Sequence, residues 1–87
     1  MSPKTISISR NDDDRTVEFA AEHAPGYAPG RLDRELGLRA EVPFAEVGAE
    51  VARLVDAGHT VVCGSVTARK LATAGADVSR TVRPSIL

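Results

Sequence analysis

The stretch "TVVCGSVTAR", Thr60–Arg69, decides which class of fold the sequence indicates. Its first part belongs to a short apolar, β-branched run, which predicts a buried strand over 59–63. Its second part opens a segment with helical spacing, which predicts a helix over 66–76. The only cysteine of the chain, Cys63, is therefore expected at the end of a strand, separated from a helix by Gly-Ser.

The segments on either side extend this unit into an α/β domain. Residues 77–82 and 4–9 alternate apolar and polar side chains, which is typical of strands. The strand–helix–strand unit over 60–82 should form a parallel crossover. The sequence therefore predicts a small three-layer α/β domain with a short, mainly parallel sheet.

Helical spacing predicts three further helices, over 15–24, 31–38 and 44–58. The last of them carries an apolar stripe and ends at Gly58, a residue type that favours a helix C-terminus. The charged run before the first helix predicts a turn whose aspartates, Asp12, Asp13 or Asp14, cap that helix. Two Pro-Gly pairs predict a loop over 25–30.

Length and charge limit the kinds of protein that the chain can be. The 87 residues predict a single domain, 1–87. With 11 basic and 12 acidic residues and a net charge of −1, no general attraction to nucleic acid or to a membrane is expected. One cysteine, no secretion signal and no long apolar run predict a cytoplasmic protein. An edge strand such as 4–9 would offer the contact for a homodimer.

The position of Cys63 in the sequence supports two hypotheses about its role. At a strand end before a helix, the amides of Gly64, Ser65, Val66 and Thr67 would stabilise a thiolate, and Arg69 would add positive charge. The spacing from Cys63 to Arg69 is also that of phosphatase loops, although no aspartate can be assigned there as the general acid. Alternatively, Cys63 is a buried strand residue, because free cysteine is among the most buried residue types.

The segment from Glu41 to Leu87 resembles the C-terminal half of a rhodanese-like domain. The stretch "VPFAEV" stands where that family has a strand-to-helix entry of the form "IP-x-x-E". The loop "CGSVTA" is similar to the family's "CGSGVTA", with one glycine fewer. The stretches "LATAGADV" and "PSIL" match the family's "L-x-x-AG-x-DV" and "GGIL" endings.

This resemblance implies a rhodanese-like fold and a small, atypical sulfurtransferase. Cys63 would carry sulfane sulfur as a persulfide, taken from a small anionic donor such as thiosulfate and passed to a thiol or another thiophilic acceptor. The loop residues Gly64 to Thr67 would stabilise the charged sulfur, and Arg69 would attract the donor. No cofactor is implied. The two histidines, His23 and His59, show no metal-ligand spacing, and both are expected at the surface.

A non-enzymatic function is the alternative. The stretch over 31–59 is similar to a helix-turn-helix with "L-x-x-ELGL" before a longer helix and "AGH" before a wing. Its longer helix carries Glu46, Glu50 and Asp56, which would repel DNA phosphates. This reading predicts a winged-helix-like or degenerate rhodanese-like domain that binds a protein or regulates one, with Cys63 in a structural role.

Overall fold

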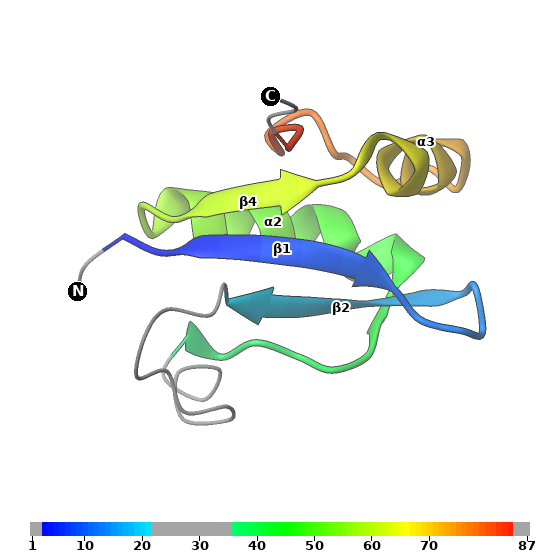
Figure 1. Cartoon of the computed structure of the whole chain (residues 1–87), viewed down its shortest axis with the longest axis horizontal. Coiled ribbons are helices and arrows are strands. Elements are labelled where there is room, and N and C mark those ends of the chain that lie inside the picture. The colour runs from blue at the N-terminus through cyan, green and yellow to red at the C-terminus, as the bar shows by residue number, and fades with distance from the viewer. Residues whose placement is uncertain (1–2, 22–35, 85–87) are drawn as a thin grey trace.

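The computed structural model describes residues 3–21 and 36–84, and its centre is one mixed sheet (Figure 1). The sheet has four strands in the order β3-β2-β1-β4. Their bounds are β1 Thr5–Arg10, β2 Thr16–Ala21, β3 Val42–Pro43 and β4 Thr60–Cys63. A 3-10 turn, η1 (Phe44–Glu46), leads into helix α2 (Val47–Asp56), and helix α3 (Ser65–Thr73) follows β4.

The predicted α/β class is confirmed, but the prediction of a mainly parallel sheet is wrong. The pairings β1–β2 and β2–β3 are antiparallel, and only β1–β4 is a parallel ladder. The central strand β1 is therefore paired on both sides. It leaves no free edge, so the strand expected at 4–9 does not offer the edge contact expected for a dimer.

The sheet is mixed because residues 16–21 form a strand where a helix was predicted over 15–24. In β2, Val17, Phe19 and Ala21 are buried and alternate with less buried neighbours. The same residues fit helical spacing almost as well, since small alanines suit both periods. Pairing with the neighbouring strands decides between the two. It places Ala21 and Phe19 opposite the buried Ile6 and Ile8 of β1, and Val17 opposite the buried Val42 of β3.

The aspartate run makes the hairpin turn between β1 and β2, so its predicted role as a helix cap is wrong. A carboxylate oxygen of Asp13 accepts hydrogen bonds from the backbone N–H groups of Arg15, at 3.0 Å, and Thr16, at 3.2 Å. Asp14 adopts the left-handed conformation, with φ 58°. An aspartate tolerates this conformation better than most residues, which suits it to a tight turn.

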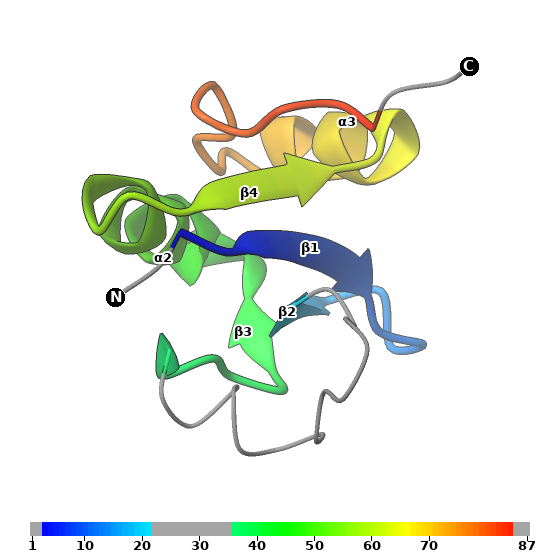
Figure 2. The ribbon, with the colours of Figure 1, turned by 60° about the vertical axis from the view of Figure 1, so that its left-hand side comes forward.

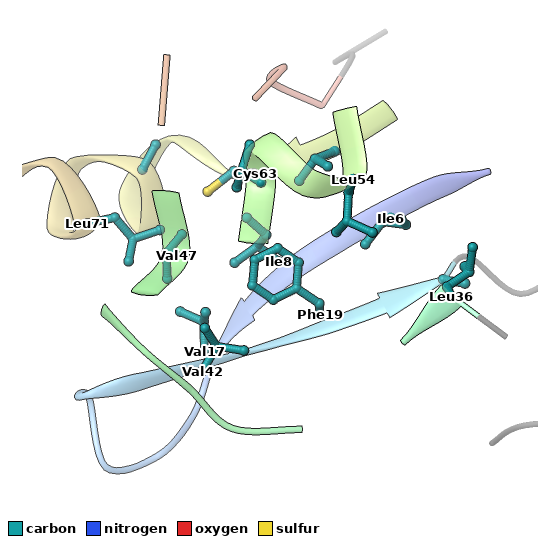
Figure 3. Packing of buried hydrophobic residues seen from close by; sticks show 14 residues of the cluster. Ile6, Ile8, Val17, Phe19, Leu36, Val42, Val47, Leu54, Cys63 and Leu71 are labelled. Carbon is teal, nitrogen blue, oxygen red and sulfur yellow. The ribbon is translucent and has the colours of Figure 1, made fainter. Parts of the chain in front are cut away.

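The hydrophobic core lies on one face of the sheet. Ile6 and Ile8 of β1 lie opposite Ala21 and Phe19 of β2 and opposite Val61 and Cys63 of β4, so all six side chains share a face. Figure 3 shows these residues packed with buried side chains of both helices. The helices contribute Val47, Val51, Leu54, Ala68 and Leu71. The described part of the chain is thus two layers deep, and the prediction of three layers is wrong for it.

The helix predicted over 44–58 is confirmed as η1 followed by α2. Val47, Val51 and Leu54 recur at helical spacing and are nearly fully buried. Gly58 has φ 96°, a conformation that glycine adopts without the cost that a side chain would add, so it ends the helix as expected.

The strand predicted over 77–82 is reduced to one bridge between Val62 and Val82, which is parallel as expected. A turn closed by the hydrogen bond from the Thr81 N–H to the Val78 carbonyl oxygen, at 3.2 Å, interrupts the segment. The Asp77 carboxylate supports this turn, because it accepts hydrogen bonds from both the N–H and the hydroxyl of Ser79. Val82 then pairs with the backbone of Val61 and Cys63, with both hydrogen bonds at 2.9 Å. Figure 2 shows this segment running beside β4 in the same direction.

The winged-helix arrangement is wrong, because α2 is followed by β4, which pairs in parallel with the interior strand β1. The predicted loop 25–30, most of the predicted helix 31–38 and His23 lie outside the described residues. Neither α2 nor α3, nor any other helix in the described ranges, is long and apolar enough to span a membrane.

Substitutions in β2 test its strand pairing. Phe19→Ala removes a side chain that is 2% exposed and should lower the free energy of unfolding by about 3–5 kcal/mol. Glu18→Ala, on the opposite face, should change it by less than about 0.5 kcal/mol. Urea denaturation of both variants measures the difference, and similar losses at the two positions would contradict the strand.

Candidate functional site

The cysteine lies where the sequence predicts it, at the end of β4 and two residues before α3. Its side chain, however, belongs to the core-facing side of the strand. Cys63 is opposite Ile8 in the parallel ladder and has 0% of its surface exposed. In Figure 3 its sulfur points into the cluster of buried side chains. A reagent in solvent therefore has no direct approach to the sulfur.

The environment of Cys63 favours the neutral thiol. Burial raises the pKa of the Cys63 thiol, and the positive charge of Arg83 lowers it by a smaller amount. The sequence led us to expect a stabilised thiolate with a lowered pKa, and burial shifts the pKa in the opposite direction. The guanidinium of Arg83 also lies near the cysteine backbone, where its Nη1 donates a hydrogen bond to the carbonyl oxygen of Cys63 at 3.4 Å.

The residues after the cysteine form a helix start. Gly64 is the N-cap, with φ −64° and ψ 155°, and its carbonyl accepts the first helical hydrogen bond, from the Ala68 N–H at 2.8 Å. The amides of Ser65, Val66 and Thr67 precede that bond, as at any helix N-terminus. Ser65 and Val66 are exposed, whereas the sulfur of Cys63 faces the core. The expected site residues are thus neighbours in the chain but do not share one face.

Arg69 lies in a different environment from Cys63. It lines an open groove of about 370 Å³ together with Phe44, Lys70, Thr73 and Ala74. Arg69, Lys70 and Thr73 of α3 and the C-cap residue Ala74 lie on the side of the helix away from the buried Ala68 and Leu71, as helical spacing requires. None of the residues Cys63 to Thr67 lines this groove, so the structure does not bring Arg69 together with the cysteine there.

The hairpin turn is tied to two of the residues that line this groove. The Lys70 ammonium donates a hydrogen bond to the Asp14 carboxylate at 2.7 Å, and Arg10 reaches the same carboxylate at 2.9 Å. The hydrogen bond from Lys70 is the largest cause that lowers the pKa of the Asp14 carboxyl. On the other side, the Phe44 N–H donates to the carbonyl oxygen of Arg15 at 3.3 Å. Among the described residues, Arg69 makes no ion pair.

His59, the histidine within the described residues, is buried and helps to hold two strands together. His59 was expected at the surface, but it is only 7% exposed, and that expectation is wrong. Its Nδ1 accepts a hydrogen bond from the Lys4 N–H at 3.1 Å, which joins the start of β4 to the start of β1. Within the described ranges, no three His, Cys, Asp or Glu side chains gather where they could hold a metal ion.

Sequence reasoning missed both Arg83 and Phe44 as neighbours of the proposed site residues. Arg83 reaches Cys63 because the chain returns beside β4, and Phe44 reaches α3 from the turn before α2. The helical spacing of Arg69, Lys70, Thr73 and Ala74 was a usable signal for one wall of the groove. The contacts of Arg83 with Cys63 and of Phe44 with the groove join segments distant in the chain, so no local sequence pattern indicates them.

Comparisons of this chain with protein families, with curated proteins and with solved structures found no match.

The raised pKa of Cys63 predicts how stability changes with pH. The folded chain holds the thiol proton more tightly than the unfolded chain, in which the pKa of a cysteine is about 8.5. The stability that this proton contributes is therefore fully present below about pH 8.5. As the pH rises from there through the folded pKa, the free energy of unfolding should fall by up to about 1.4 kcal/mol per pH unit. Cys63→Ala should lack this fall.

Denaturant unfolding gives the free energy of unfolding of the unsubstituted chain and of Cys63→Ala at each pH of this alkaline range. The difference between the two isolates Cys63, because all other titrating groups are shared. A stability difference that instead grows with pH would mean a stabilised thiolate and would contradict the burial argument.

The two glycines that flank β4 should respond differently to alanine. Gly64→Ala adds a Cβ with no atom within 4 Å at an ordinary φ. Alanine is a poorer N-cap than glycine but reduces the entropy of the unfolded chain, so the two effects offset and the free energy of unfolding should change by less than about 0.5 kcal/mol. Gly58→Ala also has space, but its φ of 96° should cost about 1–2 kcal/mol. Thermal unfolding compares the two, and a larger loss at Gly64 would show that its lack of a side chain is required.

Proposed function

We propose that this chain is a non-enzymatic binding domain in which Cys63 is a residue of the hydrophobic core. The observation that carries the proposal is the full burial of the Cys63 side chain on the helix-covered face of the sheet. A catalytic thiol must reach its substrate and must ionise easily. Burial opposes both requirements.

The chemistry expected of a sulfurtransferase also fits this position poorly. A persulfide at Cys63 would add a sulfur atom and a negative charge among apolar side chains such as Ile8 and Leu71. Packed cores resist added volume, and a buried charge is costly unless hydrogen bonds compensate it. The loop amides that would have to provide those bonds begin a helix whose exposed first residues are Ser65 and Val66.

A binding function is supported by the surface that the fold leaves open. The groove beside α3 is mostly apolar and carries two cations, Arg69 and Lys70. Such a combination of apolar surface with a few placed charged groups is typical of ligand and partner sites. A single free cysteine suits a reducing compartment, so we propose a cytoplasmic location.

Sulfur transfer is the second candidate, and one observation favours it. Cys63 ends a strand in the parallel β1–β4 pair and is separated from α3 by Gly64 alone, the order that the resemblance to rhodanese-like domains implies. In that mechanism the Cys63 thiolate would attack the outer sulfur of thiosulfate, form a persulfide and release sulfite. Cyanide would then take the outer sulfur as thiocyanate and restore the thiolate.

The two candidates differ in what Cys63 does. We expect no formation of thiocyanate from thiosulfate and cyanide above the level of Cys63→Ala. A thiol-reactive aromatic disulfide should label the native chain slowly and the urea-unfolded chain at once. Thiocyanate formation that disappears in Cys63→Ala would overturn the proposal in favour of sulfur transfer.

Stability gives a second, independent measurement of the structural role. Cys63→Ala should cost about 1 kcal/mol of unfolding free energy, because little volume is lost. Cys63→Ser should cost more, about 1–3 kcal/mol, because it places a hydroxyl in an apolar core. Equal and negligible losses in the two variants would mean that the side chain is not packed as described.

A further inference from the structure

We propose that the groove beside α3 binds a peptide segment of a protein partner in which an apolar side chain stands next to carboxylates. The groove is the one lined by Phe44, Arg69, Lys70, Thr73 and Ala74. This inference rests on the proposed binding function, because it names the partner chemistry of that same surface.

The shape and lining of the groove favour an apolar anchor. Its volume of about 370 Å³ is close to the lower end of ligand pockets, which run from roughly 300 to 1,000 Å³. The ring of Phe44, which packs partly against the core, and the methyl group of Ala74 provide apolar surface. A single aliphatic or aromatic side chain placed there would lose water contact on the side that faces Phe44 and Ala74.

The charges on the groove favour an acidic neighbour to that anchor. Arg69 and Lys70 carry two positive charges, and Arg69 pairs with no carboxylate among the described residues. The Lys70–Asp14 pair shows the geometry in which a carboxylate meets this helix face, at 2.7 Å. Because that pair is exposed, a partner's carboxylate can share or replace it, and Arg69 offers a planar guanidinium for a second contact.

The same surface disfavours a nucleic acid. A polyanion bound along α3 would have to pass the hairpin turn, which carries Asp12, Asp13 and Asp14, all exposed. Strong nucleic-acid binding needs many phosphate contacts, whereas this groove offers two cations and the chain has a net charge of −1. A peptide needs only to place one or two carboxylates beside its anchor.

The test is a titration of the full chain, labelled with nitrogen-15, with a short synthetic peptide that has one leucine flanked by glutamates. We expect amide shift changes at Phe44 and at Arg69 to Ala74. Two control peptides replace the glutamates by lysines or the leucine by glycine, and both should bind at least about tenfold more weakly. Added salt should weaken binding of the acidic peptide.

A matched pair of variants locates the site. Arg69→Glu should weaken binding of the acidic peptide at least about tenfold. Arg80→Glu makes the same charge change at a residue that pairs with Asp56 of α2 and does not line the groove, so it should leave the affinity unchanged. The amide spectrum of each variant reports whether it is folded.

Three results would overturn the inference: no shift changes at saturating acidic peptide, equal binding of the lysine peptide, or tighter binding of a single-stranded oligonucleotide at the same residues. None of them depends on Cys63. If the peptide fails while thiocyanate formation is absent, the named partner is wrong and the proposed binding function stands. If Cys63-dependent thiocyanate formation is found, the proposed function fails whatever the peptide does.

Discussion

The pairing of Ile8 with Phe19 on one side and with Cys63 on the other is the contact on which the rest of the structure depends. It is the place where an antiparallel and a parallel ladder meet on the central strand β1. Side chains alternate along a strand, so this register places the buried residues of three strands on one face. A shift of β4 by one residue would turn Cys63 outward, and the same shift of β1 would turn Ile8 away from the core.

This constraint also accounts for the separation between the cysteine and the charged residues. The face of the sheet that carries Cys63 and Ile8 is covered by α2 and α3, because the buried residues of both helices belong to the same core cluster. Amphipathic α3 buries Ala68 and Leu71, and the opposite side of the helix therefore carries Arg69 and Lys70. The packing that buries the sulfur is the same packing that places the cations on the exposed side of α3. For this reason our proposal places binding at the surface of α3 and gives Cys63 a role in stability.

Local sequence patterns predicted the secondary structure correctly where a pattern is compatible with only one type of element. The alternation around Ile6 and Ile8, the apolar stripe of α2 and the β-branched run before Cys63 were each predicted as they occur. They were insufficient in "RTVEFAAEHA", where valine and alanines fit a helix as well as a strand. They also overestimated the strand over 77–82, where the side chain of Asp77 stabilises a turn instead.

The sequence by itself determined the α/β class, most of the elements, and the position of Cys63 between a strand and a helix. These depend on interactions within a few residues, such as helical spacing, strand alternation and the left-handed glycine that ends α2. Only the tertiary structure decided that β2 is a strand, that Cys63 faces the core, and that Phe44 joins Arg69 in one groove. The physical reason is that each depends on contacts between segments distant in the chain, and burial against those segments overrides the local preference.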